Sequence, residues 1–467
     1  ARGRAGVDVL DDHVIGVQRM VIPEDDIDCL EAAAPDGPLI LYGYHNLVQG
    51  DIDRTDLDAI TAERPLFIWH YSGHDFYLNS AAIKMAKLTP ALATQFHGVD
   101  LDENGELTGR IYEDAGLALF GAIGPLLLNP AHIEKGFTGY ETLFREAGVT
   151  TVAEMGYGIF GRTLEDANIA AHYGADDPYR LYLVPEHRAF TAEFGADAPA
   201  KMLELTTDTE RRAPVLPQVK LFTDAAFYSQ TMRLSEPGYI GGQSKGSKGL
   251  WVTGPDTLEG TMKPYWDAGL DIHIHSNGDA AQDATLTAFE AVKGTPQDGQ
   301  RLVIEHGGLI TPPQLAKAKD LGVGISVASH YVYYMGKNYE DAIGERVKYI
   351  TPLRSAMDKG IPTTVHSDAP LAPPVPLRAA SVHMTRATKE GAVSTPSERL
   401  TKEQALRAIT LNAAWSLGID DKIGSIEPGK LADFTILDAN PMDTDAENWP
   451  DIPVWGVVLG GDVRAVD

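Results

Sequence analysis

The chain has 467 residues, 43% apolar and 22% charged, so it can bury a large core and is not expected to be disordered. Its formal charge of −27 argues against binding to nucleic acid or to anionic membranes, whose phosphates it would repel. The one cysteine, Cys29, excludes an intrachain disulfide and a cysteine-ligated metal centre. A metal site would have to use His, Asp, Glu or a modified Lys.

No secretory signal is visible at the start of this sequence, because acidic residues follow Ala1–Arg4 at once and no apolar run appears, so none is expected. The longest apolar stretch, Ala115–Leu128, contains Pro125 and is too short to cross a bilayer. We therefore expect a cytoplasmic protein that does not bind membranes. The sequence does not begin with Met, and we expect its natural N-terminus to be missing.

The first third of the chain does not follow the pattern of the remainder. We interpret residues 1–38 as a segment leading from a missing first strand, and 39–147 as an inserted cap that leads into the main domain. Leu39–Tyr42 and Leu66–Tyr71 are predicted strands, and Asn79–Lys87 is a predicted helix.

Residues 148–417 alternate short β-branched runs with amphipathic stretches such as Ala280–Val292 and Pro312–Leu321, which predicts a parallel sheet covered by helices. The predicted strands are 148–154, 180–184, 218–222, 271–275, 301–306, 322–328 and 362–368. Seven is one short of a closed barrel, and the missing strand would precede Gly148. We predict an α/β fold: a (β/α)8 TIM-type barrel with an inserted cap region and a small accessory β-sandwich unit.

Residues 418–467 form the predicted accessory unit. It follows a predicted helix, Leu400–Leu417, for which Thr401 is a plausible N-cap. Asp433–Leu437 and Val454–Leu459 are predicted strands, the second ending at Gly460 and Gly461.

Polar residues stand at the ends of the predicted barrel strands. They are Lys220, His275, His306, His366 and Asp368. Because the carboxyl ends of barrel strands ring one cavity, these side chains should converge. Imidazole nitrogens and carboxylate oxygens are ligands for a borderline divalent ion such as Zn²⁺.

Each residue taken alone has a structural alternative. A single His in a strand is more often a hydrogen-bonded core residue than a ligand, and His273 has the same parity as His275. Lys220 is costly to bury unless it is modified or paired with Asp224 or Glu154. Asp368 could cap a turn. Their conjunction at successive strand ends favours a site.

The chain resembles the amidohydrolase superfamily, and within it the branch of N-substituted formamide deformylases and amidohydrolase family 3 proteins. The resemblance covers most of the chain and rests on Val219–Asp224, His275–Asp279, Ile304–His306, His366–Pro370, Ser72–His74 with Asn79–Ser80, Leu400–Leu406 and the specific phrase Gly424–Leu437.

The resemblance implies a set of metal ligands. Lys220 would be carboxylated and bridge two metal ions, His275 and His306 would hold one ion, and Asp368 would bind the other and act as general base. A metal-bound hydroxide would attack the carbonyl, and Asp368 would carry the proton to the leaving nitrogen. His306 is thus implicated in both binding and catalysis.

Other polar residues are expected around these ligands. Asp279 and Glu305 are candidates to orient the imidazoles, and His273 and His366 are candidates for the same outer shell or for the metal itself. His74 and His330 are candidates for contact with substrate, although either could be a surface or core residue.

The sequence departs from the superfamily in lacking a His-x-His pair before Gly148. We expect that this pair lies in an N-terminal portion missing from the sequence. The alternative is a natural loss of half the site, leaving one ion. Glu154 could then substitute as a ligand, although a pairing with Lys220 is favoured.

Three functions are open. The first is a metal-dependent hydrolase of a C–N bond in an amide, formamide or cyclic amide. The second is a metal-dependent deaminase of an aminated heterocycle, and the third is a metal-poor binding protein without catalysis.

We expect a small-molecule substrate and one or two ions, with zinc favoured over manganese, iron or nickel. The cap and the tyrosine-rich loop His330–Tyr339 should set substrate choice. A homo-oligomer is compatible with the sequence.

Overall fold

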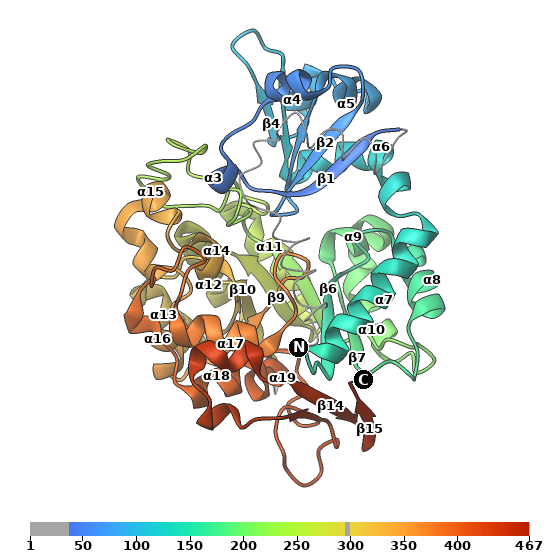
Figure 1. Ribbon diagram of the computed structural model, residues 1–467, viewed down its shortest axis with the longest axis vertical. Helices are drawn as coiled ribbons and strands as arrows, with labels where there is room; N and C mark the ends of the chain where they lie inside the picture. Colours follow the sequence, from blue (N-terminus) through green and yellow to red (C-terminus); the bar gives the residue numbers. More distant parts are fainter. Residues whose placement is uncertain (1–36, 295–298, 467) are drawn as a thin grey trace, which may run out of the picture. The chain divides into compact units, whose positions relative to one another are not determined.

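A computed structural model describes residues 37–294 and 299–466, which fall into two compact units (Figure 1). The first unit holds residues 37–132 together with Ala226–Gln230, and the second holds the remaining described residues from Ile133 onward. The predictions for residues 1–38, including Cys29, fall almost entirely outside the described part. Residues 133–147, predicted with the cap, belong to the second unit.

The first unit is built on a five-stranded sheet of order β1-β2-β3-β5-β4. β1 and β2 are parallel and the other pairs are antiparallel. The elements are β1 (Leu39–Tyr44), α3 (Asn46–Gln49), α4 (Arg54–Ile60), β2 (Leu66–His70), β3 (Asp75–Leu78), α5 (Ser80–Met85), β4 (Val99–Leu101), β5 (Leu107–Tyr112) and α6 (Leu117–Leu127). The strands and the helix predicted in this region are confirmed. Asn79 accepts the N–H of Ala82 and so caps α5.

In the described residues, the second unit contains seven successive strands that pair in parallel, as predicted. They are β6 (Thr151–Tyr157), β7 (Arg180–Pro185), β8 (Gln218–Phe222), β9 (Asp271–Ser276), β10 (Leu302–His306), β11 (Gly324–Ala328) and β12 (Thr363–His366). β6 pairs with β7, and β8 to β12 form one sheet. Parallel bridges Leu183–Val215 and Glu186–Lys220 join β7 to the β8 edge.

The predicted closed (β/α)8 barrel is not what the described residues form. No ladder joins β12 to β6 in the part of the chain that the structure describes, so the seven strands make an open row. The prediction already lacked one strand, and closure needs a strand between these two edges.

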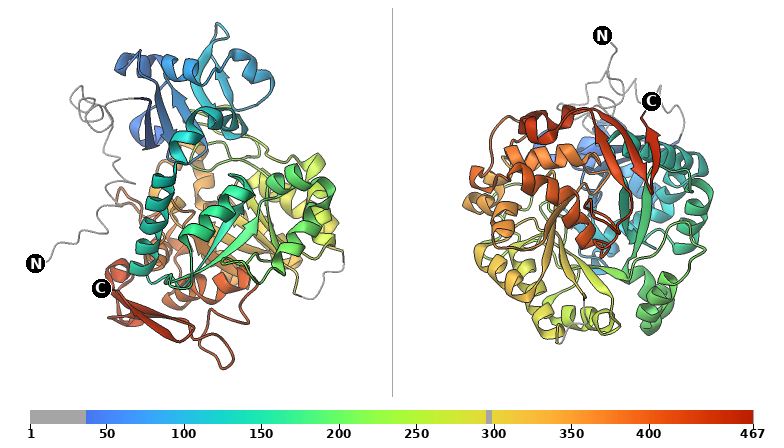
Figure 2. Two further views of the ribbon diagram at one scale, coloured as in Figure 1. Left: turned by 90° about the vertical axis from the view of Figure 1, so that its right-hand side faces the viewer. Right: turned by 90° about the horizontal axis from the view of Figure 1, so that it is seen from below.

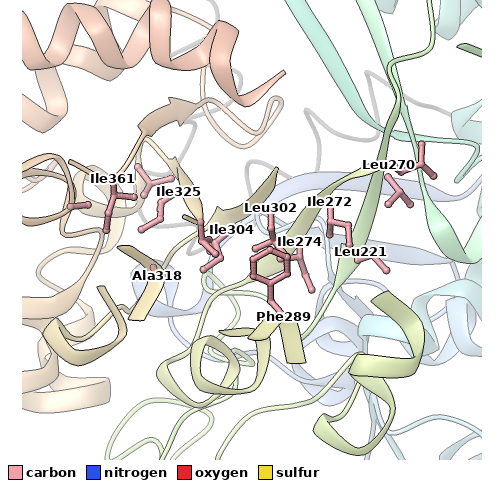
Figure 3. Close-up of a cluster of buried hydrophobic side chains, with 14 of the residues drawn as sticks. Leu221, Leu270, Ile272, Ile274, Phe289, Leu302, Ile304, Ala318, Ile325 and Ile361 are labelled. Carbon is pink, nitrogen blue, oxygen red and sulfur yellow. The ribbon is translucent and has the colours of Figure 1, made fainter. Parts of the chain in front are cut away.

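Helices cover the outer face of this row (Figure 2). They are α7 (Pro130–Glu146), α8 (Arg162–His172), α9 (His187–Phe194), α10 (Ala198–Thr206), α11 (Pro255–Asp267), α12 (Asp279–Val292), α13 (Pro312–Leu321), α16 (Leu353–Asp358), α17 (Pro376–Thr385), α18 (Lys402–Ile409) and α19 (Leu411–Ser416). Alternate strand residues such as Ile272, Ile274 and Ile304 pack under Phe289 of α12 and Ala318 of α13 (Figure 3). This layer is the main core.

Two local predictions are corrected. The predicted loop His330–Tyr339 contains helix α14 (Tyr331–Met335) and leads into α15 (Tyr339–Ile343), and Tyr331, Tyr334 and Tyr339 are buried. The predicted single helix Leu400–Leu417 is two helices, α18 and α19. Thr410 separates them because its φ of −130° and ψ of −94° are not helical.

The C-terminal unit is a single three-stranded antiparallel sheet in the described residues, rather than the predicted sandwich. It consists of β13 (Phe434–Leu437), β14 (Val454–Leu459) and β15 (Asp462–Ala465). Thr435 Oγ1 donates to the Gly148 carbonyl at 2.7 Å. A Cβ on Gly148, whose φ is +69°, would lie 2.3 Å from Thr435 Cγ2, so only glycine allows this sheet to close on the start of β6.

No helix in the described part of the chain is long and apolar enough to cross a membrane.

Candidate active site

The carboxyl ends of β8, β9, β10 and β12 carry the predicted site residues on one edge of the sheet. Ladder register places Lys220 beside His273, and His275 beside Glu305. Residues level with each other in a parallel sheet point to the same face. The inner face, opposite the helices, therefore holds a column of titratable side chains.

His306, His366 and Asp368 form the tightest group. One potential ligand atom from each lies within 4.8 Å of the others. His366 Nε2 is 3.1 Å from His306 Nδ1, and Asp368 Oδ2 is 3.7 Å from that same nitrogen. Both His306 and Asp368 have left-handed backbones, with φ of +73° and +54°. Such conformations are uncommon outside glycine and cluster at functional sites.

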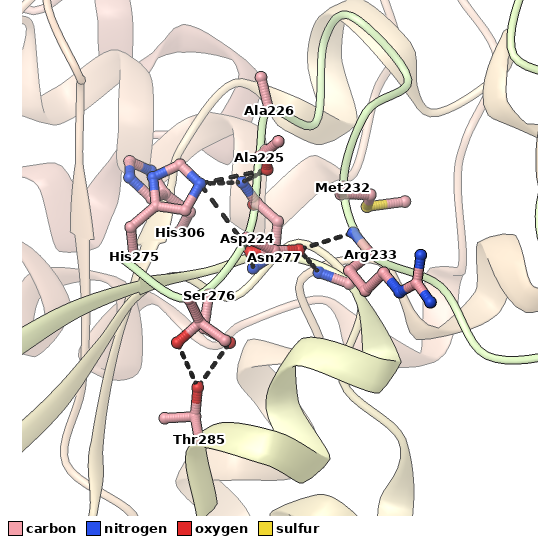
Figure 4. A network of polar contacts seen from close by, with 12 residues as sticks. Asp224, Ala225, Ala226, Met232, Arg233, His275, Ser276, Asn277, Thr285 and His306 are labelled. Atoms are coloured by element: carbon pink, nitrogen blue, oxygen red, sulfur yellow. Dashed lines mark hydrogen bonds and ion pairs between the residues drawn. The ribbon is translucent and has the colours of Figure 1, made fainter. Parts of the chain in front are cut away.

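His275 lies next to this group. Its ring centroid is 4.3 Å from that of His306. Its Nε2 is turned away, 3.2 Å from the Ala225 carbonyl oxygen and 3.0 Å from Asn277 Nδ2 (Figure 4). The Ala225 carbonyl can only accept, so this nitrogen can donate to it, and Asn277 Nδ2 donates to the same carbonyl at 3.2 Å.

Lys220 is buried, with 5% of its surface exposed. Among the described residues no ion pair holds its ammonium group; the predicted pairings with Asp224 and Glu154 do not form. Glu154 instead accepts the N–H of Gly156 at 2.7 Å. Nζ lies 5.5 Å from the centre of the Phe222 ring. Burial lowers the pKa of Lys220, although the charges of Glu305 and Asp368 oppose the shift.

Glu305 links two histidines beneath the group. Its Oε1 is 2.5 Å from His273 Nδ1, and its Oε2 is 3.3 Å from His366 Nδ1, which also meets Ser326 Oγ at 2.7 Å. Burial alone would raise the pKa of Glu305, but the hydrogen bond from His273 and the charge of Lys220 lower it to about 2. The other His273 nitrogen faces the Ser416 carbonyl at 2.9 Å. Both nitrogens of His273 are therefore engaged by protein groups.

The remaining predicted residues lie elsewhere. Asp279 binds the N–H of Ser235 at 2.9 Å and the Ser235 hydroxyl, and no hydrogen bond in the described residues joins it to an imidazole. His74, in the first unit, pairs with Glu113 at 2.9 Å. His330 is buried against Tyr334, and burial lowers its pKa to about 3, as for a packed core residue.

Sequence reasoning gave too little weight to two residues. Asp224 entered only as a partner for Lys220, yet its carboxylate binds the N–H groups of Asn277, Gly278 and Arg233. His366 was predicted as either an outer-shell residue or a metal ligand, and it stands in the group with His306 and Asp368. Asp224 stands two residues after the end of β8, and His366 is the last residue of β12. These positions at strand ends were the sequence signal that could have identified both residues.

The donor set suits a divalent metal ion. Two imidazoles and a carboxylate supply the nitrogen and oxygen ligands that zinc and similar ions take in catalytic sites. A buried Lys with no ion pair among the described residues fits the same interpretation, because carboxylation would convert it to an anionic oxygen ligand.

Residues 28–465 match the amidohydrolase family. Bacillus subtilis YtcJ, named as an amidohydrolase, is 23% identical over 88% of this chain and 76% of its own length. N-substituted formamide deformylase from Arthrobacter pascens is 24% identical over 91% of this chain and 77% of its own length.

The fold resembles a solved structure. A metal-dependent hydrolase from Pyrococcus horikoshii of uncharacterised function superposes with a TM-score of 0.66 at 22% identity, covering 94% of this chain and 85% of that one.

Proposed function

The chain belongs to the amidohydrolase family of hydrolytic enzymes, and we propose that it is a metal-dependent hydrolase that cleaves a C–N bond in a small amide, formamide or cyclic amide. The observation that carries the proposal is the approach of His306, His366 and Asp368 to within 4.8 Å beside a buried, unpaired Lys220.

His306, His366 and Asp368 are the proposed nucleus of the metal site, with His275 and Lys220 completing it. Zinc is the favoured ion. When bound, a divalent ion lowers the pKa of water to about 7 and polarises a carbonyl oxygen.

Lys220 is proposed to act as a carboxylated residue. Its burial favours the neutral amine, which is the form that adds to carbon dioxide. The addition forms an N–C bond and releases one proton to solvent, so the product carries a negative charge and the costly buried cation becomes a ligand for a metal ion.

Asp368 is the proposed general base. It lies 3.7 Å from His306 while 37% of its side chain remains exposed, so it can reach both the site and incoming water. It would take a proton from the attacking water and return it to the leaving nitrogen. The name of the formamide deformylase relative supports N-substituted formamides as the first compounds to assay.

The test is the metal content per chain. Wild type, His306→Ala and Glu398→Gln are purified without chelator, supplied with Zn²⁺ and measured by elemental mass spectrometry. Glu398 is a buried carboxylate bound to Ser355, so Glu398→Gln controls for loss of stability alone. One or two ions in wild type and in the control, and fewer in His306→Ala, are expected. Wild type without metal would contradict the proposal.

Turnover is then followed on N-substituted formamides and simple amides by release of the amine. A metal-loaded protein that hydrolyses neither class would restrict the proposal to the metal site.

A further inference from the structure

Asp224 is a fully buried carboxylate that the proposed chemistry does not use. It stands two residues after β8. Its Oδ1 accepts the N–H of Asn277 at 2.8 Å, and its Oδ2 accepts those of Gly278 at 2.9 Å and Arg233 at 2.8 Å. The carboxylate thus ties together the ends of β8 and β9 and the segment at Arg233 (Figure 4). The guanidinium of Arg233 turns elsewhere, to the Gly249 carbonyl.

The turn is built closely around this carboxylate. A Cβ on Gly278 would lie 1.8 Å from the Arg233 carbonyl oxygen, so only glycine allows the two segments to approach. Gly278 also precedes α12, so its N–H points out of the helix start toward the anion.

Asn277, which this carboxylate holds by its backbone N–H, and Ala225, the residue that follows Asp224, both contact His275. Asp224 Oδ1 is 4.0 Å from His275 Nε2. The next residue, Ala225, places its carbonyl oxygen 3.2 Å from the same nitrogen, and Asn277 places its amide 3.0 Å from it. The His275 ring lies beside His306 on the other side (Figure 4).

We infer that Asp224 is a positioning residue that fixes His275 with Nε2–H donated to the Ala225 carbonyl and Nδ1 presented toward His306. The inference rests on the proposed function, in which His275 binds the metal. Histidines that bind metal commonly donate their other N–H to a carbonyl or carboxylate, which fixes the tautomer. Without Asp224 the two contacts lose their anchor and the ring can turn.

The test compares Asp224→Ala and Asp224→Asn with wild type and with Glu398→Gln. Glu398 is the matched control, because it is also a buried carboxylate that accepts a backbone N–H, at 2.9 Å from Ser355. Zinc affinity of the metal-free full chain is measured by competition with a chromogenic chelator. We expect both Asp224 variants to bind zinc about 10–100-fold more weakly. Glu398→Gln should unfold at lower temperature yet bind zinc as wild type does.

A second readout needs no metal. In ¹⁵N-histidine-labelled metal-free protein, the His275 signals are identified by their loss in His275→Gln. We expect the Nε2–H tautomer in wild type and a mixture of tautomers in Asp224→Asn. If Asp224→Ala does not fold, Asp224→Asn carries both measurements.

The outcomes separate the two proposals. Wild-type zinc affinity in Asp224→Asn overturns the positioning role and leaves the metal site standing. A wild type that binds no zinc overturns the proposed function, and the tautomer of His275 then decides this inference alone. An Nδ1–H tautomer in wild type overturns it.

Discussion

The two faces of the β8–β12 sheet differ although the same strands build both. The outer face carries Leu221, Ile272, Ile274, Leu302 and Ile304, none more than 1% exposed, packed under the helices. The inner face, one residue along each strand, carries a different set: Lys220, His273, His275, Glu305 and His366. Strand geometry alone separates the sets, because successive side chains point to opposite faces.

The difference shows which residues the fold needs and which it carries for another purpose. Burial of the outer residues stabilises the fold by about 25 cal/mol for each Å² of apolar surface. The inner residues cost free energy unless they find partners. His273 and Glu305 have found them in each other and in the Ser416 carbonyl. His306 and Asp368 approach each other beside His366 and His275, and such a group of imidazoles and a carboxylate suits the binding of a ligand.

The largest expected effect is on the inner face. Asp368→Asn should retain metal, because an amide oxygen can still bind it, but should lower kcat about 10²–10⁴-fold through loss of the general base. Turnover and metal content of the same preparation are measured together. Wild-type turnover would remove Asp368 from the proposed chemistry, and loss of metal would show that the carboxylate is needed mainly as a ligand.

The sequence predicted the seven strands well because each is a short β-branched run. The ends of β8 and β10 were placed within one residue. Whether the strands close into a barrel was not predictable, because nothing in residues 148–417 specifies what lies between β12 and β6. The split at Thr410 was also missed, since Leu400–Leu417 has continuous helical periodicity and only backbone angles reveal the break.

The site was predicted in outline and missed in its contacts. The position at a strand end identified Lys220, His275 and His306 as site residues, although His306 has the same strand parity as the outer residues Leu302 and Ile304. It could not show that His273 is fully occupied by Glu305 and Ser416, because Ser416 is distant in the sequence. The role of Asp224 was hidden for the same reason: its partners are backbone N–H groups, which no side-chain pattern records.

An intermediate effect is expected on the outer face. Ile274→Ala should lower the free energy of unfolding by about 2–5 kcal/mol, because it leaves a cavity under α12. Urea unfolding measures the loss. Since Ile274 is one residue from His275 but points to the opposite face, zinc affinity of the folded variant should stay at the wild-type value. Weaker binding would show that the two faces are coupled.

The smallest effect on stability is expected for Lys220, the inner residue whose burial is most costly. Lys220→Met should raise the free energy of unfolding of the metal-free protein by about 1–3 kcal/mol at neutral pH, because methionine fills a similar volume without an unpaired buried amine. The same substitution should abolish turnover, since methionine cannot be carboxylated. Lys220 would thus lower the stability of the fold while supporting activity, whereas Ile274 supports stability and takes no part in metal binding.

The pH dependence of the stability gained in Lys220→Met shows whether the gain comes from charge or from packing. Burial lowers the pKa of Lys220 in the folded chain below the ordinary value of 10.5. Between the folded pKa and 10.5 the unfolded chain therefore binds more protons than the folded chain. The destabilisation caused by Lys220 consequently decreases as pH rises through this range. The difference in free energy of unfolding between Lys220→Met and wild type should be largest below the folded pKa and should decrease as pH approaches 10.5. Urea unfolding in carbon dioxide-free buffer over that range measures it. A constant difference would assign the gain to packing, and the contrast between the two faces would then reflect shape and not charge.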